Sequence, residues 1–284
     1  GMKTGALVVS FPIWKHFAAH GPDALLAAEQ AQAFTLDKDT LRKLLEVCLS
    51  RGGDFADIYF ERTVSNSISL DENKISTATR GLDLGVGFRV LQGEKTGYAF
   101  SDDLDFTKLK ESAETAALIA SGVVKQKPEN FTPLFPPSYY LVKVSPETIA
   151  AKAKVELLTK ANTVARAFDK RITQVGVGFG DMNKKILIAN SEGLYVEDTQ
   201  TLTRFSVNCA ALEGDKRSMG YESKSGSYGF EHFDISLAED FARKAAEMAI
   251  RTLPAEDAPA GEFPIVIAAG YGGIFFHEAI GHSL

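Results

Sequence analysis

A strict alternation between apolar and other residues over positions 82–90 constrains the fold more than any other pattern in the chain. Its apolar members are Leu82, Leu84, Val86, Phe88 and Val90. Successive side chains of a β-strand point to opposite faces of a sheet, so this period of two predicts a strand with one apolar face. Such a face needs a covering layer, and the chain is therefore expected to form a sheet packed against other elements.

Further segments with similar alternation follow one another through short polar connections. The expected turns lie at residues 71–73, 92–93, 183, 190–193 and 214–215. Turns of this length join antiparallel neighbours, so an antiparallel meander is predicted. After residue 172, Gly176, Gly178 and Gly180 share one face of a strand, which predicts that another backbone or a helix packs closely against that face.

Four helices are predicted around these strands. One starts at residues 37–40 and stops at Gly52, and the others span 106–121, Pro146 to about residue 168, and 237–252. The acidic segment 101–105 is expected to cap the second helix rather than to bind a cation. The order helix, sheet, helix occurs twice, which indicates a weak duplication and an α+β fold class, with an antiparallel sheet flanked by helices on one side.

The chain is expected to divide into three parts. Their limits are residues 1–36, 37–253 and 254–284. The first part is an N-terminal extension with a short helix near 23–32, and the second is the α+β domain. The third is a linker followed by the start of a second, C-terminal domain that binds metal, opening with a short buried strand at 263–270. Within the second part, five prolines over 126–146 predict an extended arm on the domain surface.

Charge and cysteine usage exclude several classes of function. The net charge of −6 gives no electrostatic reason to expect nucleic acid as a partner. The longest apolar run is far too short to cross a bilayer, so no membrane partner is expected either. Cys48 and Cys209 form no CxxC pair, and this usage indicates a reducing compartment and a cytoplasmic location. Cys209 is interpreted as a buried core thiol.

The candidate catalytic residues lie near the C-terminal end, where Glu278 lies between His277 and His282 in the sequence. Imidazole is a natural zinc ligand, and a carboxylate beside the metal can act as a general base. The histidines are five residues apart, which on a regular helix turns their directions roughly 140° away from each other. Gly281 directly precedes His282, and a bend or bulge at this glycine would let both rings reach one metal ion.

Competing interpretations of these and other residues remain open. The helix could instead bury His277 in a core and place His282 at a helix end, where it interacts with the dipole. His16 and His20 are expected to be solvated, and His232 is expected in a loop. The glycines at 270, 272 and 273 are interpreted as turn residues rather than as a phosphate loop, because no lysine follows as in a Walker motif.

The His-Glu-Ala-Ile-Gly-His sequence at 277–282 resembles the HExxxH signature of the TldD branch of the TldD/PmbA zinc metallopeptidases. The similarity extends upstream, from about residue 38. The similar segments are Asp-Ile-Tyr-Phe-Glu at 57–61, Gly-Val-Gly-Phe-Arg at 85–89, Gly-Tyr-Ala-Phe-Ser-Asp-Asp at 97–103 and Ala-Asn-Ser-Glu-Gly at 189–193. The chain therefore resembles the N-terminal portion of such a peptidase.

The resemblance implies a function and a site. His277 and His282 would be Zn²⁺ ligands and Glu278 the catalytic base, with a cysteine from the C-terminal domain, beyond residue 284, as third ligand. Cys48 and Cys209 match nothing in that role. The implied substrates are short or unfolded peptides. Because the third ligand would come from the missing half, the 284-residue piece is not expected to be active alone.

A second function is kept open beside the peptidase. The resemblance also implies pairing, either as a homodimer or as a heterodimer with a TldE/PmbA-like paralogue. A chain that lacks its third ligand could then be a catalytically inactive partner or scaffold subunit. Zinc content of the natural-length protein distinguishes the two hypotheses.

Overall fold

The computed structural model describes residues 36–123, 126–256, 258–270 and 272–282. The chain forms two units, the first ending at Leu253 and the second beginning at Pro254. Each unit is described by itself. The short helix expected near 23–32, together with His16 and His20, lies outside the described residues.

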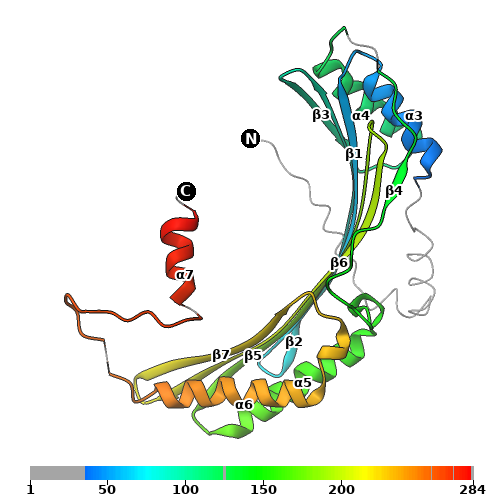
Figure 1. Cartoon of the computed structure of the whole chain (residues 1–284). Coiled ribbons are helices and arrows are strands. Elements are labelled where there is room, and N and C mark those ends of the chain that lie inside the picture. Colours follow the sequence, from blue (N-terminus) through cyan, green and yellow to red (C-terminus); the bar gives the residue numbers. More distant parts are fainter. Residues whose placement is uncertain (1–35, 124–125, 257, 271, 283–284) are drawn as a thin grey trace. The chain divides into compact units, whose positions relative to one another are not determined.

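A seven-stranded sheet forms the centre of the first unit (Figure 1). The strands are β1 (Phe55–Asp71), β2 (Lys74–Gln92), β3 (Lys95–Ser101), β4 (Thr132–Leu134), β5 (Ile172–Asn190), β6 (Leu194–Glu213) and β7 (Lys216–Gly226). Their order is β3-β2-β1-β5-β6-β4, and β7 also pairs with β6. All neighbours are antiparallel except β4, which pairs with β6 in parallel. The predicted α+β class, an antiparallel sheet with flanking helices, is confirmed.

Helices follow and precede the strands in the predicted order. They are α3 (Lys38–Leu49), α4 (Phe106–Ile119), α5 (Ala151–Phe168) and α6 (Ile235–Thr252), with short 3₁₀ turns η1 (Pro146–Thr148) and η2 (Phe230–His232). Aspartates begin three of them: the carboxylates of Asp37, Asp105 and Asp234 accept backbone N–H groups of the first turn. The capping role predicted for the acidic segment before α4 is therefore confirmed at Asp105. None of the described helices is long and apolar enough to cross a bilayer.

Two separate apolar cores lie on the same face of the sheet. One is formed under α3 and α4, and the other under α5 and α6 (Figure 1). Strand β1 supplies Ile58 and Phe60 to the first core and Ile68 and Leu70 to the second. All four occupy even positions of one strand, and side chains at every second position share a face. The two helix pairs therefore cover opposite ends of the same surface.

A buried polar belt separates the two cores in the middle of β1 and β5. Lys154 from α5 pairs with Asp181 at 2.5 Å, and their side chains are only 4% and 1% exposed. Asn66 donates to the same carboxylate at 2.8 Å. Asn183 donates to the Thr201 hydroxyl at 3.2 Å. The belt pairs most of its buried polar groups with one another, although the side-chain oxygen of Asn183 has no hydrogen-bond partner among the described residues.

The belt explains a wrong prediction. A turn was expected at Asn183, but β5 continues through this residue, which pairs with Val64 on β1 and Thr201 on β6. Asparagine favours turns because its side chain bonds to nearby backbone. Here its amide bonds instead to a hydroxyl on the next strand, so pairing on both sides overrides the local preference.

The third helix and the proline-rich arm also differ from expectation. Pro146 opens the short turn η1, and α5 begins only at Ala151. The segment 126–146 is mostly exposed, as predicted for a surface arm, and it also contributes the short strand β4 to the sheet. Residues 263–270 were predicted to form a short buried strand, but they form none and are exposed. Their backbone has no neighbouring strand with which to pair among the described residues.

Close helix packing occurs at glycines other than those predicted. A Cβ on Gly176 would meet nothing within 4 Å, and one on Gly178 or Gly180 would meet only the Ser206 hydroxyl or the Asn66 carbonyl of the sheet itself, so among the described residues no helix packs closely on this face. A Cβ on Gly97 in β3 would overlap the carbonyl of Ala116 in α4. One on Gly220 in β7 would overlap the carbonyl of Ala245 in α6. In each half of the sheet, the last helix therefore packs closely against a glycine of the third strand: α4 against β3 and α6 against β7. This agrees with the predicted duplication.

We expect Gly220→Ala to lower the free energy of unfolding by about 1–3 kcal/mol, because the new methyl group must displace α6 backbone. Gly176→Ala is the matched control, since it has open space and should be neutral or slightly stabilising. Urea unfolding followed by circular dichroism measures both. Equal stability of the two variants would contradict the close packing.

Removing one partner of the buried ion pair should be costly. Lys154→Met leaves the Asp181 carboxylate buried with only Asn66 as a partner, and a loss of about 3–5 kcal/mol is expected. Lys244→Met is the control, because Lys244 pairs with Asp240 at 2.7 Å on the exposed side of α6 and should change stability little. Both are compared by urea denaturation, and a mild effect at Lys154 would contradict the burial of the pair.

Candidate metal centre

The second unit contains the residues for which metal chemistry was predicted. After an exposed stretch, Gly270 has a φ of +96°, and its carbonyl accepts the N–H of Gly273 at 2.9 Å. This left-handed conformation is one that glycine adopts without strain. The expected turn is therefore present. It leads into α7 (Gly272–Phe276) and then into a single wide turn, η3 (His277–Gly281).

The wide turn is a π-helical turn. The N–H of His282 donates to the carbonyl of His277 at 3.2 Å, which is the i→i+5 bond that defines this geometry. Residues five apart therefore lie one above the other, whereas on a regular α-helix they would diverge. Such turns occur mostly as single bulges in α-helices and are frequent at functional sites.

The two imidazoles are brought together by this turn. Their ring centroids are 4.5 Å apart, with the planes at 77°. One ligand atom from each of His277, Glu278 and His282 lies within 4.8 Å of the other two. Among the described residues, no other group of three metal-binding side chains is this close. All three side chains are exposed, so the alternative in which His277 is a buried core residue does not fit this geometry.

Gly281 has a different role from the one expected of it. It does not adopt a positive φ, so the turn does not require the conformational freedom of glycine. A Cβ at this position would lie 3.5 Å from Nδ1 of His277, which is an ordinary contact. The missing side chain therefore leaves the edge of the His277 ring uncovered, and the i→i+5 hydrogen bond, rather than a glycine kink, brings His282 back.

Both cysteines lie in the cores of the first unit. Burial raises the pKa of the Cys48 thiol to about 12 and that of the Cys209 thiol to about 11. A thiol must lose its proton to bind zinc or to attack a substrate. The structure thus keeps both thiols protonated at neutral pH, and Cys209 is buried as predicted.

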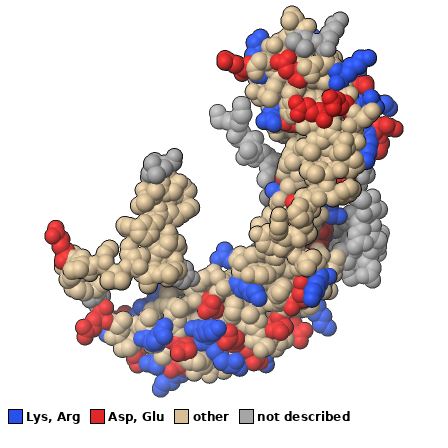
Figure 2. Space-filling view, in the orientation of Figure 1, with Lys and Arg blue, Asp and Glu red and all other residues tan. Residues whose placement is uncertain are grey.

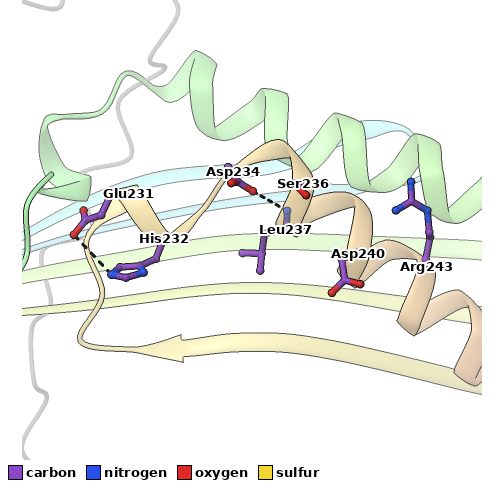
Figure 3. A pocket seen from close by; sticks show the side chains of 7 residues that line it. All are labelled: Glu231, His232, Asp234, Ser236, Leu237, Asp240 and Arg243. Carbon is purple, nitrogen blue, oxygen red and sulfur yellow. Dashed lines mark hydrogen bonds and ion pairs between the residues drawn. The ribbon is translucent and has the colours of Figure 1, made fainter.

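A hollow beside the start of α6 is a second place where polar side chains gather (Figure 3). It is lined by Glu231, His232, Asp234, Ser236, Leu237, Asp240 and Arg243. Its acidic groups already have structural partners. Asp234 accepts the N–H of Leu237 at 2.7 Å. Glu231 accepts the N–H groups of Lys143 and Val144, both at 3.0 Å. Glu231 thus anchors the arm before α5. His232 lies in a short 3₁₀ turn of the connection between β7 and α6, where a loop was predicted.

The pKa of the Glu231 carboxyl group, which anchors the arm, is lowered by its hydrogen bonds. Of these hydrogen bonds, the one from the backbone N–H of Lys143 has the largest effect on the pKa of Glu231. The charged form is therefore favoured in the fold. The contact between Glu231 and the arm was not anticipated from the sequence, because it joins segments that are far apart in the chain.

Family models match two parts of the first unit. One described as PmbA/TldA metallopeptidase domain 1 matches residues 56–120. Another, described as PmbA/TldA metallopeptidase central domain, matches residues 144–253. The first match covers β1 to α4 without α3, and the second covers the whole second half from η1 to α6. The family models therefore divide this unit where its topology repeats.

Curated relatives match most of the chain. A protein named metalloprotease TldD homolog from Haemophilus influenzae is 33% identical over 258 residues, which are 88% of this chain and 53% of the relative. One of the same name from Buchnera aphidicola is 30% identical and covers 87% of this chain and 53% of its own length. A zinc metalloprotease TldD homolog from Saccharolobus solfataricus is 23% identical over 81% of the chain and 50% of the relative. The chain spans about half the length of these relatives.

Solved structures share the fold. TldE from Thermococcus kodakarensis superposes with a TM-score of 0.56 at 21% identity, covering 73% of this chain and 46% of that one. A Thermotoga maritima protein gives a TM-score of 0.64 at 23% identity, over 78% and 50% of the two chains. With the family models and the relatives, these similarities settle the relationship: the chain belongs to the PmbA/TldD family of metallopeptidases.

Proposed function

We propose that the protein is a zinc-dependent peptidase that hydrolyses short or unfolded peptides, with His277 and His282 as metal ligands and Glu278 as general base. One observation carries the proposal. A π-helical turn brings together two histidines that are five residues apart in the chain. Their ring centroids are 4.5 Å apart, and a carboxylate lies beside them. The names of the relatives, metalloprotease and in one case zinc metalloprotease, support the same class.

The donor set is suited to zinc. Zn²⁺ prefers imidazole nitrogen, thiolate sulfur and carboxylate oxygen, and a catalytic site combines three protein ligands with an open position. The two imidazoles provide two such donors, and the Glu278 carboxylate lies beside them, with ligand atoms of all three within 4.8 Å of one another. The exposed side chains leave room for a third protein ligand and for substrate. As the resemblance to the family implies, we propose that this third ligand is a cysteine beyond residue 284; Cys48 and Cys209 are buried in the first unit.

Each residue then has a distinct role. Bound zinc would lower the pKa of a water molecule and polarise a carbonyl group. His277 and His282 hold the ion and fix its place on the helix. Glu278 takes a proton from the attacking water and returns it to the leaving amine, so one carboxylate acts first as base and then as acid.

A second candidate is a catalytically inactive partner or scaffold subunit. It is supported by the fold that the chain shares with TldE from Thermococcus kodakarensis. Such a subunit would form a homodimer or would pair with a TldE/PmbA-like paralogue. The cytoplasmic location also stays a prediction.

Replacing the proposed base tests the mechanism in the protein extended to the length of its relatives. Glu278→Gln should retain zinc but lower peptide turnover by about 10²–10⁴-fold, because the amide cannot accept the proton. Glu262→Gln, an exposed change in the same unit, is the control and should leave turnover unaltered. Turnover is followed with a quenched fluorescent peptide. Full activity of the Glu278→Gln variant would exclude the proposed base.

Metal content separates the peptidase from the inactive subunit. The natural-length protein should hold stoichiometric zinc by elemental analysis, and His277→Ala or His282→Ala should abolish it because each removes one ligand. His232→Ala, at an exposed turn of the first unit, should retain the metal. Chelator treatment should stop hydrolysis, and added zinc should restore it. A wild-type protein without metal, and with no hydrolysis, would favour the second candidate.

A further inference from the structure

The arm between β4 and α5 exposes a group of large apolar side chains. They are Leu134, Phe135, Tyr139, Tyr140 and Leu141, with exposed fractions of 56%, 87%, 80%, 69% and 77%. Residues 131–142, which include all five, contain no charged side chain. The surface around β4 in Figure 2 is accordingly mostly tan, whereas the helices at both ends of the first unit carry many charged side chains. We call residues 131–142 the neutral stretch.

Contacts at both ends hold the neutral stretch in place. At one end β4 pairs with β6, and the N–H of Thr132 donates to the carbonyl of Gly193 at 2.7 Å. At the other end, Glu231 accepts the N–H groups of Lys143 and Val144. Three residues of the stretch are prolines, which fix the φ angle of the backbone. The stretch therefore loses little conformational entropy when a partner covers it.

The composition of the neutral stretch is that of the centre of a protein–protein interface. Aromatic side chains are enriched there and charged ones are depleted, and clusters of exposed apolar side chains mark such sites. One aromatic side chain buries roughly 150–250 Å². The three exposed aromatic side chains and two leucines of the stretch therefore approach the about 800 Å² that each partner contributes to a stable interface.

The charges at the two ends of the neutral stretch fit a second copy of the chain. Glu129 precedes the stretch and Lys143 follows it; both are exposed, and neither has an ion-pair partner in the described part of the chain. Both lie equally far along the chain from Pro136. A two-fold axis near Pro136 therefore brings Glu129 of each copy toward Lys143 of the other. Beyond this pair, Lys127 falls opposite Ser145, which carries no charge.

Other occupants fit the neutral stretch less well. An uncharged surface faces its own copy without repulsion between like charges, and contact between identical surfaces closes a dimer, whereas contact with a different surface of the copy can build an open filament. Binding to anionic membranes depends on clustered basic side chains. The stretch has none, and the whole chain carries a net charge of −6.

We infer that the neutral stretch is the centre of a homodimer interface, in which two arms meet across a two-fold axis near Pro136. The three exposed aromatic side chains supply the apolar contact, and Glu129 and Lys143 of opposite copies set its register. The inference requires neither zinc nor hydrolysis. It assigns a surface to the homodimer, which the proposed function leaves open beside pairing with a paralogue.

Reversing the end charges tests the arrangement. Dissociation constants of the natural-length protein are measured by sedimentation equilibrium. Glu129→Lys and Lys143→Glu should each weaken the dimer by about three- to tenfold, because two exposed contacts per dimer become repulsive. The double variant should return to within about twofold of wild type, since both contacts are attractive again. Glu94→Lys, in the exposed turn between β2 and β3, is the control and should have no effect.

The apolar contact is tested on the same protein. Phe135→Glu should weaken the dimer by more than about tenfold, because it places a charge at the desolvated centre of the interface. Phe135 is exposed within its own subunit, so the far-UV circular dichroism spectrum should not change. Leu118→Glu, at a residue of α4 that is 58% exposed, is the matched control and should leave the dimer intact.

Several results would overturn the inference. A double variant as weak as the two single changes combined would mean that Glu129 and Lys143 do not face each other. Unchanged association of Phe135→Glu would mean that residues 1–35, sequence beyond residue 284 or a different protein covers the stretch. A monomeric wild type would also contradict the interface, and loss of binding to phosphatidylglycerol vesicles in Phe135→Glu would then identify a lipid surface.

Zinc content and peptide turnover, measured on the same variants, separate this inference from the proposed function. A dimer that responds to the substitutions as expected but holds no zinc would support the interface and contradict the peptidase. A monomer with stoichiometric zinc and peptide turnover would contradict the interface and support the peptidase.

Discussion

The pairing of β1 with β5 is the interaction on which the first unit depends. It runs without a register shift from Asp57 opposite Asn190 to Asp71 opposite Gly176. Each helix pair covers only one end of the sheet, so neither core alone would hold the two halves together. The continuous ladder does so through backbone hydrogen bonds, which are insensitive to the side chains that they join. This is why a polar belt can lie in the middle of the sheet without dividing the unit.

Much of this fold was predictable because its signals are local. The alternation at 82–90 gave a strand with one apolar face, and aspartates such as Asp105 marked helix starts. What failed depends on contacts between distant segments. Asn183 continues a strand because its neighbours on both sides pair with it, and the critical glycines are 97 and 220 because helices far along the chain approach them. No spacing within the sequence reveals either fact.

The candidate metal centre was predictable for a different reason. All its described residues lie within one turn of helix, so the types and spacing of His277, Glu278 and His282 could be read directly. The spacing of five demanded a departure from regular geometry, and the π-turn supplies it. A bulge at Gly281 was one of the predicted means, and the π-turn that ends at this residue is such a bulge, but Gly281 itself needs no special conformation. The contact of Glu231 with the arm was missed because it joins two distant segments.

The polar belt has a consequence for how the first unit loses its structure. Lys154, Asp181 and Asn66 join the two cores through directional contacts rather than through continuous apolar packing. Cooperativity within a domain is transmitted by dense side-chain packing, and it weakens where that packing is interrupted. Each half is therefore able to open while the other keeps its amide protons protected, so that hydrogen exchange would divide this single sheet into two regions of different lifetime.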